Sequence, residues 1–203
     1  MQKLTVSHAR NFRGVAFDLD GTLVNSALDF RAIRRELAFP DGVGLLEHIA
    51  TLSDPGLVEQ AHGVIHRHEM AGAERATWMP GAESLLGALN EAGVPVAILT
   101  RNSRAAVRAT CAVLEIPVGR ILTREDCAPK PSPEGLINIA KHFGLRPAQM
   151  IYVGDFIDDL TSARRAGMAA CLYRNGKNRS FASEARFVID HFKELRVLLQ
   201  SDG

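Results

Sequence analysis

The residues best suited to chemistry are two aspartates, Asp18 and Asp20, which stand two positions apart directly after a short apolar run. The run, residues 15–17, is too short for a helix and predicts a buried strand. Two carboxylates at the end of a buried strand are costly unless a cation, a proton or a substrate offsets their charge. The alternative is an acidic turn without chemistry, because Gly21 follows Asp20 and turns favour aspartate and glycine.

Strand and helix patterns alternate from about residue 80 onward, and these elements must position the aspartates. Apolar runs predict further strands at 94–99, 119–123, 149–153, 169–173 and 187–189. Helical patterns lie between them at 80–92, 102–115, 132–143, 158–165 and 191–199, with Asn102 or Ser103 capping the second and Ser132 the third. The alternation predicts an α/β fold, a Rossmann-like parallel sheet covered by helices on both faces.

Residues 26 to about 78 interrupt the alternation, because they contain no convincing strand. Helical patterns at 29–39, 42–52 and 54–76 are separated by segments rich in glycine and proline. These residues predict a small all-helical insertion after the first strand, with hinges at Asn25–Ser26 and Trp78–Pro80.

Ligands of an open parallel sheet bind at the carboxyl ends of its strands. The residues predicted at that edge, besides the first two aspartates, are Thr100, Arg101 and Asn102, then Lys130 between two prolines, and then Asp155, Asp158 and Asp159. Two acidic groups, a threonine–asparagine pair and a lysine at one edge are hard to obtain by chance. The acidic-turn alternative therefore becomes much weaker.

Composition excludes several classes of function. The 203 residues carry a formal net charge of +1, so no strong field points to a nucleic acid or a membrane surface. No apolar run approaches the roughly 18 residues that span a bilayer, and residues 1–11 lack the apolar core of a signal peptide. The three cysteines have neither metal-site spacing nor a disulfide framework. We expect a cytoplasmic protein.

With these motifs in this order, the chain resembles the haloacid dehalogenase superfamily of hydrolases. Residues 18–22 resemble the first family motif, Thr100 with Asn102 the second, Lys130 the third, and residues 154–159 the fourth. The insertion sits where that family carries a helical cap. The resemblance implies a core domain of residues 1–24 and 79–203 and a cap domain of residues 25–78.

The resemblance also implies the catalytic roles. Asp18 would attack phosphorus and form an aspartyl-phosphate, and Asp20 would protonate the leaving oxygen and later deprotonate water. Thr100 and the amide at the start of the Asn102 helix would bind the phosphoryl oxygens, and Lys130 would add positive charge to nucleophile and phosphate. Arg101 would either join the phosphate site or face solvent.

The charges at this edge call for a metal ion. Asp18, Asp155 and Asp159 carry three negative charges and a phosphate monoester about two more, whereas Lys130 offsets one. Magnesium, Mg²⁺, suits oxygen ligands beside a phosphate. By resemblance the ligands are carboxylate oxygens of Asp18 and Asp155 and the backbone carbonyl of Asp20, with Asp159 a ligand or a holder of bound water. Asp158 would be a helix N-terminal charge.

The resemblance leaves a choice of reactions. Dehalogenases of this fold lack the second aspartate, and phosphonatases use a cap lysine, which residues 25–78 do not contain. We therefore expect a Mg²⁺-dependent phosphomonoester hydrolase for a small phosphorylated metabolite, of the phosphoglycolate phosphatase type, acting as a monomer or homodimer. A phosphomutase of the β-phosphoglucomutase type and a catalytically idle binding relative remain alternatives.

The cap should set the substrate, because it closes over the site opening. Its candidate anion-binding residues are Arg31, Arg34, Arg35, Arg67 and Arg75, and its histidines His62, His66 and His68 invite a metal-site interpretation. Acidic residues outnumber basic ones in the cap, so we favour ordinary solvated helix faces for both groups. A cap this short predicts an open site with modest selectivity.

Overall fold

The computed structural model describes residues 12–200, with side chains to residue 199, so the predicted absence of a signal peptide at residues 1–11 lies outside the described part. The described chain divides into two compact units. Unit 1 comprises residues 12–25, 78–101 and 116–200, and unit 2 comprises residues 26–77 and 102–115.

Unit 1 is built on a six-stranded sheet in the order β5-β4-β1-β6-β7-β8, in which every recorded pairing is parallel. The strands are β1 (Gly14–Phe17), β4 (Val96–Leu99), β5 (Arg120–Leu122), β6 (Met150–Gly154), β7 (Ala169–Tyr173) and β8 (Phe187–Ile189). Each lies where the apolar runs predict a strand. The predicted α/β class with a parallel sheet is confirmed.

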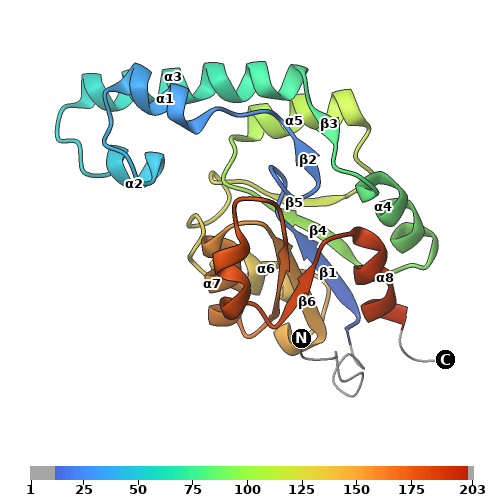
Figure 1. Cartoon of the computed structure of the whole chain (residues 1–203). Helices are drawn as coiled ribbons and strands as arrows, with labels where there is room; N and C mark the ends of the chain where they lie inside the picture. Colours follow the sequence, from blue (N-terminus) through green and yellow to red (C-terminus); the bar gives the residue numbers. More distant parts are fainter. Residues whose placement is uncertain (1–11, 201–203) are drawn as a thin grey trace. The chain divides into compact units, whose positions relative to one another are not determined.

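Helices cover both faces of this sheet (Figure 1). The pair α4 (Ala82–Glu91) and α8 (Phe192–Gln200) packs on one face, and α6 (Glu134–His142) and α7 (Ile157–Ala166) pack on the other. Two short 3₁₀ helices, η2 (Pro147–Gln149) and η3 (Arg179–Glu184), were not predicted. Pro133, rather than the predicted Ser132, occupies the N-cap of α6, although the Ser132 hydroxyl accepts a hydrogen bond from the Glu134 amide at 3.3 Å.

The alternation of side chains along β1 directs its residues to two different helix pairs. Ala16 belongs to a buried cluster with residues of α6 and α7, whereas the Phe17 ring lies edge-on to Phe192 of α8 at a centroid distance of 6.3 Å. Asp18 stands two residues after Ala16, so its side chain points to the same face of the sheet as that of Ala16. The Asp18 side chain is therefore expected on the α6–α7 face.

Unit 2 is helical, with α1 (Phe30–Leu37), α2 (Leu45–Ile49), α3 (Pro55–Glu74) and α5 (Arg104–Leu114). Asp29 caps α1 by accepting from two backbone amides at 3.0 Å, and Asp54 followed by a proline begins α3. Its core contains Ile33, Leu45, Ile49, Ala61, Val64 and Ile65. The predicted helix at 42–52 is shorter than expected, because its regular part covers only α2.

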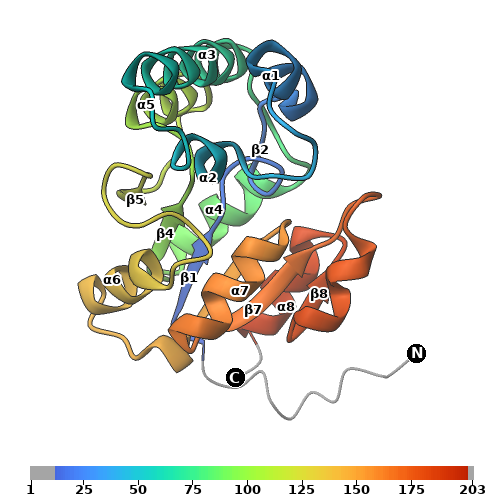
Figure 2. The ribbon, with the colours of Figure 1, turned by 90° about the vertical axis from the view of Figure 1, so that its left-hand side faces the viewer.

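Helix α5 packs beside α3 and so groups with the inserted helices, although the sequence places it in the core domain (Figure 2). The buried carboxylate of Glu69, in α3, accepts hydrogen bonds from the Ser103 hydroxyl at 2.7 Å and the Ser103 amide at 3.3 Å. Ser103 is the N-cap of α5, one of the two predicted caps. The cap boundaries 25–78 stay a prediction. In the structure, α5 groups with the inserted helices in unit 2.

Two short strands that the sequence did not predict lie where the chain passes between the units. They are β2 (Val24–Asn25) and β3 (Thr77–Trp78), which form a two-stranded sheet. The Met79 amide donates to the Leu23 carbonyl at 2.9 Å. Within residues 12–200, no helix is long and apolar enough to cross a membrane.

Candidate active site

Asp18 extends the central strand of the sheet by one residue. Its amide donates to the Val153 carbonyl of β6 at 2.9 Å, which continues the parallel ladder past the end of β1. Its side chain is buried. Burial raises the pKa of this carboxyl well above its ordinary value, and the nearby Asp159 and Asp155 raise it further, whereas Lys130 opposes the shift.

Lys130 supplies the positive charge at this carboxylate. Its ammonium donates to Asp18 Oδ1, to Asp159 Oδ1 at 2.6 Å and to the hydroxyl of Tyr152 at 3.1 Å. Burial alone would lower the pKa of Lys130, but the two carboxylates outweigh it and raise that pKa above its usual range. The lysine therefore remains charged at neutral pH.

Three carboxylates converge around this lysine. Asp18, Asp155 and Asp159 each offer an oxygen, and these atoms lie within 4.8 Å of one another. Burial, reinforced by Asp159, raises the pKa of Asp155 to about 7, although a hydrogen bond from the Asn175 amide at 3.2 Å opposes the shift. A set of oxygen donors that is short of positive charge fits a hard divalent cation.

Asp159 is held from several sides. Its Oδ2 accepts from the Phe156 amide at 3.0 Å, while its Oδ1 contacts Lys130. Gly154 makes room for this carboxylate, because a Cβ there would lie 2.3 Å from the Asp159 Cγ. Hydrogen bonds to both oxygens therefore fix the orientation of the Asp159 carboxylate beside Lys130.

A tight turn follows Asp18 and carries the second aspartate. The amides of Leu23 and Val24 both donate to the Leu19 carbonyl at 2.9 Å. Asp20 is half-buried and forms an isolated bridge with Val24. Gly21 has φ +81°, and a Cβ there would lie 2.6 Å from Asp155 Oδ2, so both the backbone conformation and the nearby Asp155 carboxylate favour glycine.

The segment after β4 contributes two residues to unit 1. Thr100 is buried, and its amide donates to the Leu122 carbonyl at 2.9 Å. Arg101 pairs with Asp158 at 2.9 Å, and both side chains are about a quarter exposed, at 26% and 25%. Since β1 lies between β4 and β6, this ion pair links the two segments that flank the Asp18 strand. Asn102 belongs to unit 2, and its phosphate-binding role stays a prediction.

Comparison with known proteins identifies the family. Residues 12–167 match the haloacid dehalogenase-like hydrolases. A haloacid dehalogenase-like hydrolase domain-containing protein of Arabidopsis thaliana is 30% identical, over 100% of this chain and 89% of that protein. The chain belongs to the haloacid dehalogenase-like hydrolase family.

Relatives within this hydrolase family include phosphatases. A phosphoglycolate phosphatase of Chromobacterium violaceum is 28% identical, over 95% of this chain and 98% of that protein. The crystal structure of a family hydrolase from Deinococcus radiodurans with bound phosphate and sodium has a TM-score of 0.70 and 21% identity, covering 93% of this chain and 95% of that one. The chain is thus a family hydrolase with phosphatase relatives, and its fold is that of the family.

Three residues near this hydrolase site were not predicted from the sequence. Tyr152 contacts Lys130, Asn175 donates to Asp155, and Asn178 donates to the Asp155 carbonyl at 2.7 Å. The two asparagines follow β7 at the same carboxyl edge, so extending the edge argument to the fifth strand would have found them. Tyr152 lies inside β6, where a tyrosine is indistinguishable in sequence from an ordinary core aromatic.

Several charged side chains of the helical unit contact one another. Arg67 and His68 both pair with Glu36, at 2.6 and 2.8 Å, and Arg34 donates to the Val43 carbonyl at 3.0 Å. His62 and His66 are exposed. Among the described residues, the acidic trio is the one group arranged to hold a metal ion.

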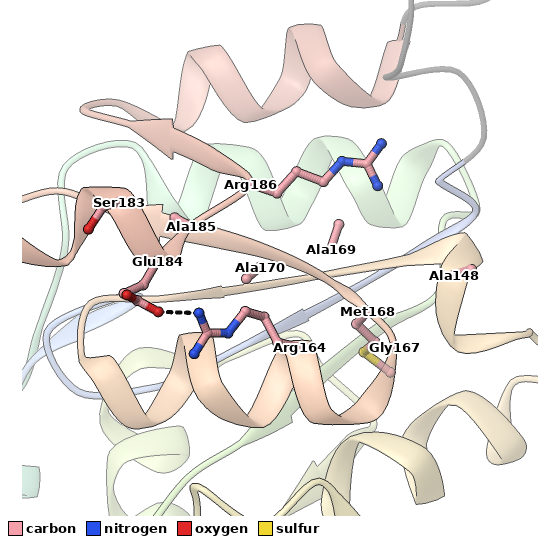
Figure 3. A pocket seen from close by; sticks show the side chains of 10 residues that line it. All are labelled: Ala148, Arg164, Gly167, Met168, Ala169, Ala170, Ser183, Glu184, Ala185 and Arg186. Carbon is pink, nitrogen blue, oxygen red and sulfur yellow. Dashed lines mark hydrogen bonds and ion pairs between the residues drawn. The ribbon is translucent and has the colours of Figure 1, made fainter.

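A surface pocket of about 450 Å³ lies at the amino end of β7, whereas the acidic trio lies at the carboxyl edge of the sheet (Figure 3). Small side chains such as Ala169 and Ala170 line it, and Arg164 pairs with Glu184 beside it. It contains no residue that the family motifs predict to be functional.

Proposed function

We propose that the protein is a Mg²⁺-dependent phosphomonoester hydrolase that acts on a small phosphorylated metabolite through an aspartyl-phosphate. The observation that carries the proposal is the contact between Lys130 and the buried Asp18 beside two further carboxylates. This arrangement combines a nucleophile, a fixed positive charge and a cation site within one edge of the sheet.

The reaction has two halves. A carboxylate oxygen of Asp18 attacks phosphorus, the phosphorus–oxygen bond of the ester breaks, and Asp20 gives its proton to the leaving alcohol oxygen. Asp20 then takes a proton from water, which attacks the same phosphorus and releases inorganic phosphate. Asp18 is thereby regenerated as a carboxylate and Asp20 as an acid. Lys130 offsets negative charge on the nucleophile and on the phosphoryl group.

The oxygen donors suit Mg²⁺, with Asp18 and Asp155 as carboxylate ligands, the Asp20 carbonyl as a third, and Asp159 as a ligand or a holder of bound water. A bound Mg²⁺ supplies positive charge to the phosphoryl oxygens. Phosphate binding is assigned to Thr100, Arg101, Asn102 and Lys130. The phosphate in the Deinococcus radiodurans relative supports a phosphoryl-binding site in this fold.

The substrate is proposed to resemble phosphoglycolate, on the basis of the phosphatase of Chromobacterium violaceum. Asp20 favours an oxygen leaving group, since a dehalogenase needs no proton donor there. The phosphomutase and the idle binding relative remain alternatives from the sequence, and no contact recorded within residues 12–200 favours them. The cytoplasmic location and the monomeric or dimeric state stay predictions.

A panel of phosphate esters tests this proposal. The purified protein is assayed for phosphate release from phosphoglycolate, sugar phosphates and a chromogenic ester, with Mg²⁺ and with a chelator. We expect release with at least one ester, and loss of release on chelation. Absence of release from every ester at saturating Mg²⁺ would refute the function.

A further inference from the structure

A tyrosine lies fully buried in the central part of the sheet, where the proposed reaction gives it no role. Tyr152, in β6, has 0% of its surface exposed. Its neighbours in register are Ala16 of β1 and Ala170 of β7, and Ala97 of β4 stands beside Ala16. The side chains of these alanines are small, so they leave space on the α6–α7 face of the sheet for the large Tyr152 ring.

The Tyr152 hydroxyl lies among polar atoms. It donates to the Leu99 carbonyl at 3.0 Å and accepts from the Lys130 ammonium at 3.1 Å. It also lies 3.2 Å from Asp159 Oδ1. Because an ammonium can only donate, an oxygen lone pair of the hydroxyl faces the lysine, and the one hydroxyl proton is directed at two acceptors, the Leu99 carbonyl and Asp159 Oδ1.

The Lys130 ammonium has three N–H donors, and three acceptors surround it. They are Asp18 Oδ1, Asp159 Oδ1 and the Tyr152 oxygen. The third contact completes the set and fixes the rotation of the ammonium. Because the lysine head has rotatable donors on a flexible four-carbon stem, a third contact further restricts its position.

The same hydroxyl also connects two parts of the site. Leu99 immediately precedes Thr100, which is assigned to the phosphate. Tyr152 therefore links Lys130 to the backbone of the phosphate-binding segment through two consecutive hydrogen bonds.

We propose that Tyr152 is a positioning residue, whose hydroxyl holds the Lys130 ammonium in register with Asp18, Asp159 and the Thr100 backbone. The proposal rests on the proposed function for the task of Lys130 in phosphoryl transfer. Tyr152 itself does not touch the reacting atoms. It acts by restricting the lysine to the position in which its charge serves both nucleophile and phosphate.

The test compares Tyr152→Phe with Tyr173→Phe. Both changes remove one hydroxyl oxygen and keep the ring, and Tyr173 is a buried residue of the adjacent strand β7 whose ring stacks on Phe192 at 4.6 Å. Two quantities are measured for each protein. They are kcat and KM with a chromogenic phosphate ester and Mg²⁺, and the proton–nitrogen NMR signal of the buried Lys130 ammonium, assigned by its loss in Lys130→Met.

We expect Tyr152→Phe to lower kcat about 10- to 100-fold with KM within threefold, because a misplaced charge affects the transition state most. The Lys130 signal should shift or exchange faster with water, while Tyr173→Phe leaves both quantities within twofold of wild type. A kcat within twofold of wild type in Tyr152→Phe, or an unchanged Lys130 signal, would overturn the proposal.

Two further results keep the outcomes distinct. In the wild-type protein the Lys130 ammonium should exchange slowly, and rapid exchange there would overturn the inference whether or not the variant folds. A wild-type protein that hydrolyses no ester would instead count against the proposed function, and the NMR comparison would still decide whether Tyr152 holds Lys130.

Discussion

At the scale of single residues, the site consists of positively and negatively charged side chains that are buried in contact with one another. Lys130 contacts Asp18 and Asp159 in a buried environment, so each charge depends on its partners. Removing one member leaves the others buried without compensation, which costs more than the loss of one surface ion pair. Substitutions here should therefore affect both stability and chemistry, and control variants are needed to separate the two.

Replacement of Asp18, the proposed nucleophile, is the first residue-scale prediction. Asp18→Asn keeps the size of the side chain but removes the nucleophilic carboxylate, and we expect kcat to fall by roughly a thousandfold or more. Phosphate release measures the effect, with Asp158→Asn as the matched change at a neighbouring aspartate. Equal losses in the two variants would refute the special role of Asp18.

The raised pKa of Asp155 predicts how metal affinity depends on pH. With a pKa of about 7, Asp155 is largely protonated at pH 6, and a cation must displace that proton. Apparent Mg²⁺ affinity should therefore fall up to about tenfold per pH unit below pH 7 and level off above it. Calorimetric titration of the metal-free protein at pH 6, 7 and 8 measures this.

The sign of the associated stability change follows from the same shift. A carboxyl whose pKa is higher in the folded state binds its proton more tightly there, so the metal-free protein loses this contribution as the pH rises toward 7. Added Mg²⁺ should restore stability near neutral pH. Metal binding at pH 6 without proton release would contradict the assignment of Asp155 as a ligand.

At the scale of elements, the turn after β1 places the Gly21 backbone close to the Asp155 carboxylate, a proposed metal ligand. Gly21→Ala combines the strain of a positive φ with a Cβ 2.6 Å from Asp155 Oδ2. Gly42→Ala is the matched control, because its φ is +80° but nothing lies within 4 Å. Both variants should lose about 1–2 kcal/mol of stability, while only Gly21→Ala should also weaken Mg²⁺ binding and activity. Equal Mg²⁺ affinity in the two variants would argue against the turn's role.

The contact between α3 and α5 carries a second element-scale prediction. Glu69→Ala leaves the buried Ser103 hydroxyl without this acceptor, and the free energy of unfolding should fall by about 1–3 kcal/mol. Glu59→Ala removes an exposed carboxylate from the same helix and should change it by less than about 0.5 kcal/mol. Thermal and urea unfolding compare the two. An equal effect would show that the Glu69 contact adds no stability.

Elements with strong local signals were predictable, and elements fixed by distant contacts were not. β7 and β8 match their predicted ranges because continuous apolar runs there are bounded by polar segments. The two-residue strands β2 and β3 carry no periodicity, since pairing alone defines them. The same holds for the site. The motif residues are visible in the sequence, and Asn175 could have been found there because it follows a predicted strand at the same edge. Tyr152 is recognised only when the strands bring it beside Lys130.

At the scale of the whole molecule, the chain separates a sheet unit from a helical unit, each with its own apolar core. Lys130 and the acidic trio, which includes the proposed nucleophile Asp18, all belong to the sheet unit. Asn102, by contrast, belongs to the helical unit together with the inserted helices. The chemistry is thus assigned to one unit, and choice among substrates is proposed for the other.

The central claim is that hydrolysis passes through a phosphorylated Asp18. The most direct measurement is an acid quench of the enzyme during turnover of a ³²P-labelled ester with Mg²⁺, followed by trypsin digestion and mapping of the label. The account predicts label on the peptide of residues 14–31, at Asp18, which hydroxylamine removes and Asp18→Asn abolishes. Turnover with label on another residue, or undiminished labelling of the Asp18→Asn protein, would contradict it.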